Sequence, residues 1–466
     1  MRLKPVLASI VLLGLSSTAF AATKSTVNVQ NQMISLQNQI NQLEQSINQN
    51  NGGTTSGGGT ALQRRLASCP NWYDSITVSG LVNVDGILSS RRANFMSATE
   101  GPTPQTPTLI HYFGDRSASD LALDNADLFV DARINKWTKA HIGLNYQDNN
   151  NNYVTDNPKS PSNPGGDPVD GGGNSNKSLI IKPWMGSLID EAYVTFGNFC
   201  ESPIYFRVGK QYLNFGNYDR FATVPTYTQL LSQTNDTAAT LGFVQNGFYG
   251  SVYGFRGIPS AKDNANGTVN INNWGANLGW MMKQQGSKLN LQVGYLNNMA
   301  DVDYVSTSAS WPTNRLSLAT NGYSTPVGAL SLDITGKLGM FDAYAHYVTA
   351  LSEFKNAEIV SAKLYSTFGA QPSAIDVGAG LTTMVMNHKS RFGLSYDYSW
   401  DAYNVGMYGM PEARVMGTFD MNVSRNVNVG LYVYHDQNYN IINPIFPDNA
   451  GRGETTGILH VGVMFA

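Results

Sequence analysis

The chain has few charges, only two cysteines and no apolar run long enough for a membrane helix after its first 21 residues. Charged residues make up 14% of its 466 residues, whereas ordinary soluble proteins carry about 25%. A helix that spans a bilayer needs about 20 apolar residues in succession, so a bundle of membrane helices is excluded. Low charge combined with 46 Gly and 24 Tyr favours a β-rich membrane protein.

Further absences remove other classes of protein. Two cysteines exclude a disulfide scaffold and a Cys-rich metal cluster. The 30 basic and 33 acidic residues nearly balance, which argues against a nucleic-acid partner. The six histidines show no metal-binding spacing, and no catalytic constellation stands out. We therefore expect a protein that is not an enzyme, with no catalytic residues, no metal site and no cofactor.

Residues 1–21 resemble a secretory signal peptide. Arg2 and Lys4 precede a short apolar core, residues 6–15, and small residues follow as far as Ala21. The alternative is a membrane anchor, but the core is too short to span about 30 Å of hydrocarbon. An exported chain without membrane helices is either soluble outside the cytoplasm or a β-barrel.

Residues 22–49 predict a short coiled-coil helix in the periplasm. Apolar residues recur at alternating spacings of four and three, at Val29, Met33, Leu36, Ile40, Leu43 and Ile47. So short a helix is marginal alone, so we expect self-association as a dimer or trimer. The alternative is an amphipathic helix lying on the barrel. Residues 50–75 begin with NNGGTTSGGGT and predict a flexible linker.

From residue 76 to residue 466 the dominant period is two, which predicts strands with one apolar and one polar face. Sixteen strands are expected, joined alternately by short turns and long connections, as in outer-membrane barrels. They lie near residues 76–87, 125–136, 139–147, 188–197, 203–211, 238–245, 248–255, 272–283, 288–297, 328–338, 341–349, 374–385, 390–399, 413–424, 427–435 and 456–466. The apolar stretch 359–368 fits this alternation only if it lies within a connection.

The fold class is thus all-β, a porin-like antiparallel transmembrane barrel of sixteen strands in the bacterial outer membrane. A soluble β-sandwich is the alternative, but its strands are shorter, about five or six residues. On this register twelve charged residues face the lumen: the acids Asp85, Asp127, Asp131, Glu191, Asp333, Asp342, Asp397 and Asp420, and the bases Arg133, Arg207, Lys337 and Arg391. Lipid is the expected partner of the apolar face.

The connection 212–237 is rich in Tyr and Phe. By analogy with porins, whose third extracellular loop folds into the channel, it predicts a constriction formed by Tyr218, Asp219, Arg220 and Tyr227. The alternative is a loop packed over the rim. Cys69 and Cys200 both fall at the expected periplasmic rim, where a disulfide is plausible; two free thiols are the alternative.

Three stretches carry a resemblance to a known family: the helix 29–47, DEAYVTFGNF at 190–199 and YFRVGKQYLNFGNYD at 205–219. With them the chain resembles the LbtU family of siderophore porins. The resemblance implies a barrel without a plug domain that takes up a ferric siderophore. Arg207, Lys210 and Arg220 would then complement an anionic chelate. A general diffusion porin for small hydrophilic solutes, or an adhesin that uses the coiled coil, are the competing hypotheses.

Overall fold

The structure is a computed structural model, and it describes residues 76–90, 94–99, 108–113, 118–146, 189–258, 270–284, 286–308, 325–355, 370–402, 410–440, 451 and 453–465. The expected signal peptide (1–21), coiled coil (22–49) and linker (50–75) lie outside the described residues and stay predictions.

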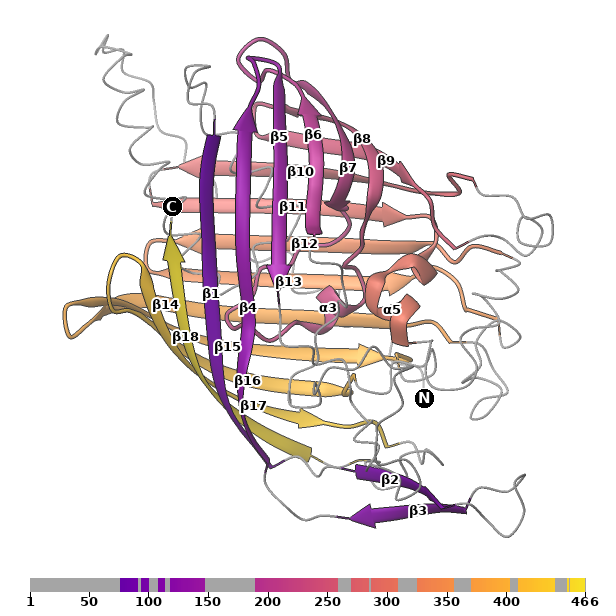
Figure 1. The fold of residues 1–466 in the computed structure, drawn as a ribbon, viewed down its shortest axis with the longest axis vertical. Coiled ribbons are helices and arrows are strands. Elements are labelled where there is room, and N and C mark those ends of the chain that lie inside the picture. The colour runs from indigo at the N-terminus through magenta and orange to yellow at the C-terminus, as the bar shows by residue number, and fades with distance from the viewer. Residues whose placement is uncertain are drawn as a thin grey trace, which may run out of the picture. The chain divides into compact units, whose positions relative to one another are not determined.

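Sixteen antiparallel strands close into one barrel, as predicted (Figure 1). Neighbours in the ring are neighbours in the sequence, and β18 closes the ring against β1. The strands are β1 (Ile76–Ser89), β4 (Ala118–Arg133), β5 (Thr138–Tyr146), β6 (Ile189–Phe196), β7 (Ile204–Tyr212), β8 (Asn235–Gln245), β9 (Phe248–Phe255), β10 (Asn273–Gln284), β11 (Ser287–Leu296), β12 (Ala329–Leu338), β13 (Phe341–Ala350), β14 (Ser373–Val385), β15 (His388–Trp400), β16 (Ala413–Asn422), β17 (Val427–Gln437) and β18 (Gly453–Phe465).

The structure departs from the expected strands in one connection. There β2 (Asn94–Thr99) and β3 (Thr108–Phe113) pair as a separate two-stranded sheet. In addition, β4 begins at Ala118 rather than near residue 125. The register slips between Asn83 and Val84 of β1, where β4 carries Asp124 as an extra residue. This bulge shifts the period-two pattern by one residue. The pattern therefore did not identify residues 118–124 as part of the same strand. The stretch 359–368 lies outside the described residues.

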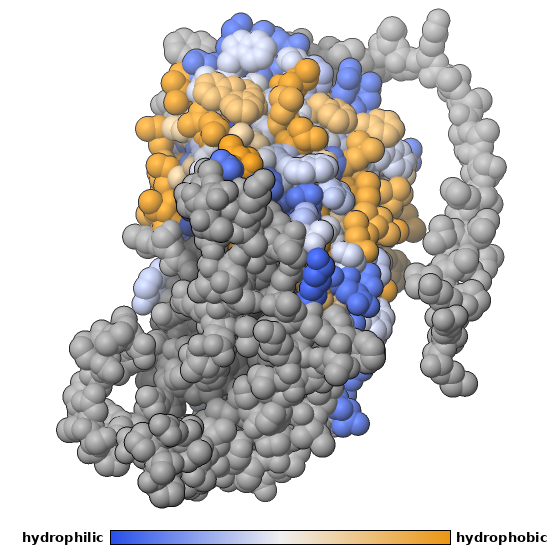
Figure 2. All heavy atoms as spheres, turned by 90° about the vertical axis from the view of Figure 1, so that its right-hand side faces the viewer, coloured by the Kyte–Doolittle hydropathy of each residue, from blue (hydrophilic) through white to orange (hydrophobic). Residues whose placement is uncertain are grey.

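The barrel wall has an apolar outer face and a polar inner face. On β1 the side chains of Asn83, Asp85 and Ile87 are buried and point inward. Outward residues are apolar and exposed, for example Leu278 on β10 and Leu332 on β12. Figure 2 shows apolar side chains gathered in a band on one side of the barrel, with hydrophilic residues above it. All twelve charged residues expected in the lumen lie on the inward face.

The described helices are short: α3 (Tyr227–Leu230), η1 (Met299–Asp301) and α5 (Asp303–Ser308). No helix among the described residues is long and apolar enough to cross a membrane.

Tyrosine rings lie over glycines on the inner wall. Tyr205 of β7 is directly opposite Gly242 of β8, and Tyr249 of β9 is directly opposite Gly279 of β10. A Cβ atom at either glycine would collide with the ring of its partner. The glycine thus lets a large ring lie flat along the wall, which accounts for part of the high Gly and Tyr content.

The outward face generates a test of the barrel. Leu278 lies at the middle of β10 and is 52% exposed, while its neighbour Asn277 faces inward. We expect Leu278→Lys to lower the free energy of unfolding in lipid vesicles by about 2–4 kcal/mol. Asn277→Lys is the matched control and should cost clearly less. If urea unfolding showed that the two variants lose the same free energy of unfolding, the assignment of the outward and inward faces would be contradicted.

Candidate functional site

The loop of residues 213–234, called the inserted loop here, runs from β7 to β8 and is almost wholly buried. Every residue from Arg220 to Thr234 is buried. The loop contains α3, which contacts β13, β14 and β15 on the far side of the ring from β7 (Figure 1). The loop therefore enters the barrel and does not pack over its rim.

The first part of the inserted loop is bound to β11 and β12. The backbone N–H of Gly216 donates to Ser331 Oγ at 3.2 Å, and the N–H of Asn217 donates to Asp333 Oδ1 at 3.2 Å. The Gln292 side chain donates to the Gly216 carbonyl at 3.1 Å. These bonds satisfy backbone groups that would otherwise be buried without a partner.

The middle of the inserted loop reaches strands at the closure of the ring. Thr223 Oγ1 donates to Asp85 Oδ2 of β1 at 3.3 Å. Arg414 of β16 donates from Nη1 to the Pro225 carbonyl at 3.2 Å. The same guanidinium forms a two-bond ion pair with Asp436, at 2.6 and 2.9 Å. Anchors on β11, β12, β16 and β1 show that the loop crosses the lumen.

Aromatic packing adds to these bonds. The Phe221 ring lies edge-on to Tyr344, with 4.8 Å between ring centroids. The guanidinium carbon of Arg391 stands 3.9 Å from the centroid of the same Phe221 ring. Arg414 lies over the ring of Tyr227 at 5.1 Å. Buried cation–π contacts of this kind contribute roughly 0.5–2 kcal/mol each.

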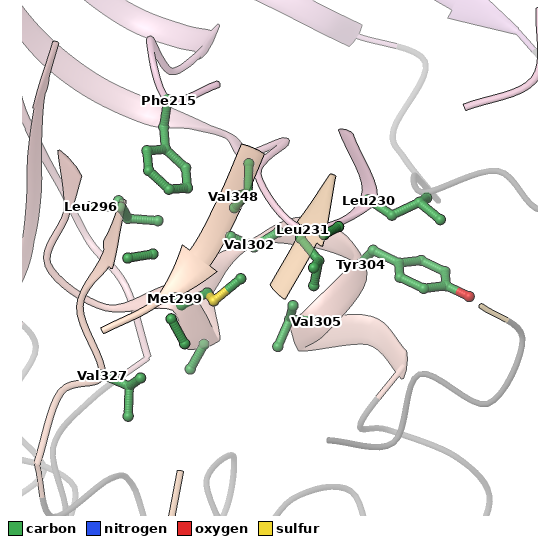
Figure 3. Packing of buried hydrophobic residues seen from close by; sticks show 14 of the residues in the cluster. Phe215, Leu230, Leu231, Leu296, Met299, Val302, Tyr304, Val305, Val327 and Val348 are labelled. Carbon is green, nitrogen blue, oxygen red and sulfur yellow. The ribbon is translucent and has the colours of Figure 1, made fainter. Parts of the chain in front are cut away.

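An apolar cluster joins the inserted loop to the connection after β11 (Figure 3). Phe215, Leu230 and Leu231 from the loop pack with Met299 and Val302 from the η1–α5 segment. Strand ends complete the cluster through Leu296, Ala329, Val348 and Ala374. These strand ends all adjoin long connections. The cluster also contains Phe354, Ala370, Ala402 and Met410 from the connections after β13 and β15, so several connections pack together at that end of the barrel. The sequence analysis anticipated the first of these connections and missed the others.

Three predicted constriction residues lie within this packed loop. Tyr227 is fully buried, and Tyr218 donates from its hydroxyl to the Phe215 carbonyl at 2.8 Å. Arg220 donates to Gln229 Oε1 at 2.5 Å inside the loop. Burial lowers the pKa of Arg220 to about 10, so the guanidinium is still charged at neutral pH. These three residues hold the loop together and present little surface to a solute.

Asp219 is placed differently. It is half-buried, accepts a bond from the Asn217 side chain at 3.3 Å and lies within electrostatic range of Lys288 on β11. The structure thus sets a carboxylate of the loop against an amine of the wall.

The other predicted contacts are dispersed. Arg207 is 2% exposed and stacks against the rings of Tyr193 and Tyr205. Arg133 lies at the end of β4, beside a short turn. Lys210 is on the outward side, because the strand alternation separates it from Arg207, and it donates to the Ile189 carbonyl at 2.8 Å. Arg207 and Lys210 thus lie on opposite faces of β7, and the role of Arg133, Arg207 and Lys210 as ligand contacts stays a prediction.

Sequence analysis missed three His–Asp pairs on the inner wall. His460 and Asp85 are directly opposite across β18 and β1, with Nδ1 and Oδ1 2.7 Å apart. The other two pairs are His346 with Asp333, at 3.0 Å, and His141 with Asp131, at 2.9 Å. Two of these aspartates, Asp85 and Asp333, also hold the inserted loop. Among the described residues, no group of three or more His, Cys, Asp or Glu is arranged to hold a metal ion.

Cys200 lies in the short turn between β6 and β7 and is disulfide-bonded. Cys69, the other cysteine of the sequence, lies outside the described residues. Their pairing stays a prediction. A peptide digest under non-reducing conditions should yield one linked species that contains both cysteines and is lost on reduction. Two titratable thiols in the unfolded, unreduced protein would contradict the pairing.

The packing of Phe221 generates a second test. Phe221→Ala removes the contacts with Tyr344 and Arg391, and large-to-small changes at buried Phe cost about 3–5 kcal/mol. We expect faster amide hydrogen exchange in the 213–234 loop and unchanged exchange in the strands. Phe206→Ala, on the outward face, is the control. Unchanged exchange in the loop would contradict the role given to Phe221.

Comparisons with known proteins come from both sequence and structure. No family model matches the chain. A UPF0422 protein of Coxiella burnetii is 22% identical over 355 residues, which cover 75% of this chain and 65% of that protein. A UPF0422 protein of Legionella pneumophila is 25% identical over 333 residues, which cover 69% of this chain and 55% of that protein. The chain thus spans between about half and two thirds of the length of these relatives.

Solved porins share the fold. OprB of Pseudomonas putida matches with a TM-score of 0.50 at 10% identity, over 88% of this chain and 96% of that one. The outer-membrane channel DcaP of Acinetobacter baumannii matches with a TM-score of 0.45 at 11% identity, and the match covers 84% of this chain and 97% of DcaP. The closed ring of sixteen strands and the match to OprB show a porin-like barrel, whereas the resemblance to the LbtU family stays a prediction.

Proposed function

We propose that the chain is an outer-membrane channel for small hydrophilic solutes. The observation that carries this proposal is a closed barrel whose outer face is apolar, whose inner face is polar and whose lumen is crossed by a loop. The outer band suits lipid, and the inner face suits water and polar solutes. The role is transport rather than catalysis.

The topology supports an orientation in the membrane. In bacterial barrels the short turns face the periplasm and the long connections face outward. Ile76, where β1 begins, is opposite Ala132, close to the short turn between β4 and β5. The preceding segment therefore joins the barrel at the short-turn end. This agrees with a periplasmic N-terminal helix, through which copies of the chain would associate as a dimer or trimer.

The narrower proposal for the cargo is a ferric siderophore. It is supported by the resemblance of the stretches 190–199 and 205–219 to the LbtU siderophore porins. A general diffusion porin agrees equally well with the barrel, because Arg207 and Arg220, the expected chelate contacts, are buried in packing. Saturable binding of the solute distinguishes the two hypotheses, because a dedicated siderophore route requires it and a general diffusion porin does not.

Uptake measurements separate the two cargo hypotheses. Iron-starved cells with and without the protein would be given a siderophore loaded with radioactive iron and, in parallel, a neutral sugar of similar size. The siderophore proposal predicts that deletion removes saturable iron uptake and leaves sugar entry unchanged. Parallel loss of both solutes would contradict it and support an unselective channel. No change in either would contradict the channel itself.

A further inference from the structure

Three lysines form a row on the inner wall, one or two residues from the short turns. Lys283 at the end of β10 is directly opposite Lys288 at the start of β11. Lys288 is in turn directly opposite Lys337 at the end of β12. Their two turns adjoin, since the Gly339 N–H donates to the Gly286 carbonyl at 2.8 Å. We call Lys283, Lys288 and Lys337 the lysine row.

The row concentrates positive charge on a small area of wall. Side chains directly opposite each other in antiparallel strands have Cβ atoms about 4.5–5.5 Å apart, and like charges there repel. Lys389 on β15 lies within electrostatic range of Lys337 and of Arg391, which adds to the positive potential. A site of this kind gains most from a mobile anion that neutralises several amines at once.

The carboxylates around the row are engaged with individual cations. Asp342, opposite Lys337, forms an ion pair with Arg391. Asp420 is also directly opposite Arg391, and Asp219 of the inserted loop approaches Lys288. The described side chains named here comprise five basic groups (Lys283, Lys288, Lys337, Lys389 and Arg391) and three carboxylates (Asp219, Asp342 and Asp420).

The row is open to solvent, unlike the acidic residues at the other end of the lumen. Lys283 is exposed, and Lys288 and Lys337 are half-buried. Asp376 and Asp397, opposite each other near the long connections, are 0% and 1% exposed. On β10, β11 and β12 the inner wall near the short turns therefore presents basic charge to a solute.

We propose that the lysine row is a binding site for small anions with two or more negative charges, of the carboxylate or phosphate class. The inference rests on the proposed function only for the route by which the anion arrives. Lysine suits this role because its ammonium is a compact charge on a flexible stem that adapts to carboxylate or phosphate oxygens. The site would hold such an anion at the periplasmic mouth of the barrel.

The test uses the purified full chain in planar lipid bilayers, with citrate and pyrophosphate as probes. Either anion, added on the short-turn side, should reduce the ion current in a saturable way. In K283Q/K288Q/K337Q the half-blocking concentration should rise about tenfold or more, because three charge contacts of modest strength are lost together. Lys355→Gln is the matched control: this exposed lysine in a long connection donates to Thr325 at 2.7 Å.

The outcomes separate the site from the channel. Block by citrate alone assigns the carboxylate class, and block by pyrophosphate alone assigns the phosphate class. Equal block of the wild type and the triple variant would overturn the proposal.

If the wild type does not conduct, the proposed channel function fails, and a second measurement tests the site: calorimetric titration of citrate and pyrophosphate into the detergent-solubilised protein. Binding lost in the triple variant supports the site, and the absence of binding to the wild type overturns it. Heat-dependent gel mobility checks that each variant is folded.

Discussion

The arrangement of side chains inside this barrel depends on one requirement: the buried backbone N–H and carbonyl groups of the inserted loop need hydrogen-bond partners. Each buried N–H or carbonyl without a partner costs about 1–3 kcal/mol, and the loop brings more than a dozen buried residues into the lumen. Side chains of the barrel wall supply these partners. Ser331 and Asp333 accept hydrogen bonds from backbone N–H groups in the first part of the loop, and Arg414 donates one to a backbone carbonyl in its middle. The inward polar side chains of these strands therefore bind the loop as well as line the lumen.

This constraint explains why several wall charges come with a second partner. Asp85 is held by His460 and Asp333 by His346, while each also accepts a bond from the loop. Arg414 is fixed by Asp436 before it reaches the Pro225 carbonyl. An anchor that is itself oriented loses less conformational freedom when it binds the loop. The apolar cluster of Phe215, Leu231 and Met299 packs at the long-connection end.

The two ends of the lumen are consequently different environments. At the long-connection end, Asp376 and Asp397 are covered by packed chain, and charge there is shielded from solutes. At the short-turn end, the lysine row is accessible and near Arg391 and Lys389. The inner wall thus presents packed chain at one end and basic side chains of β10, β11 and β12 at the other.

Much of the barrel was predictable because alternation is a local property of the sequence. It located sixteen strands and the inward position of residues such as Asp397 and Lys337. It failed where one extra residue, Asp124, shifts the phase of β4. The His–Asp pairs and the lysine row are cross-strand neighbours, such as Lys283 and Lys288, and their proximity depends on register and ring order rather than on spacing along the chain. The anchors of the loop depend on three-dimensional packing in the same way.

The central claim is that the inserted loop narrows the lumen. The most direct test is the single-channel conductance of the full chain beside a variant in which residues 213–234 are replaced by a short Gly-Ser turn. Our account predicts that the variant still forms a barrel and conducts several-fold more current, because a sixteen-stranded ring without the loop is wide enough for an aqueous channel. A folded variant with unchanged or lower conductance would contradict it.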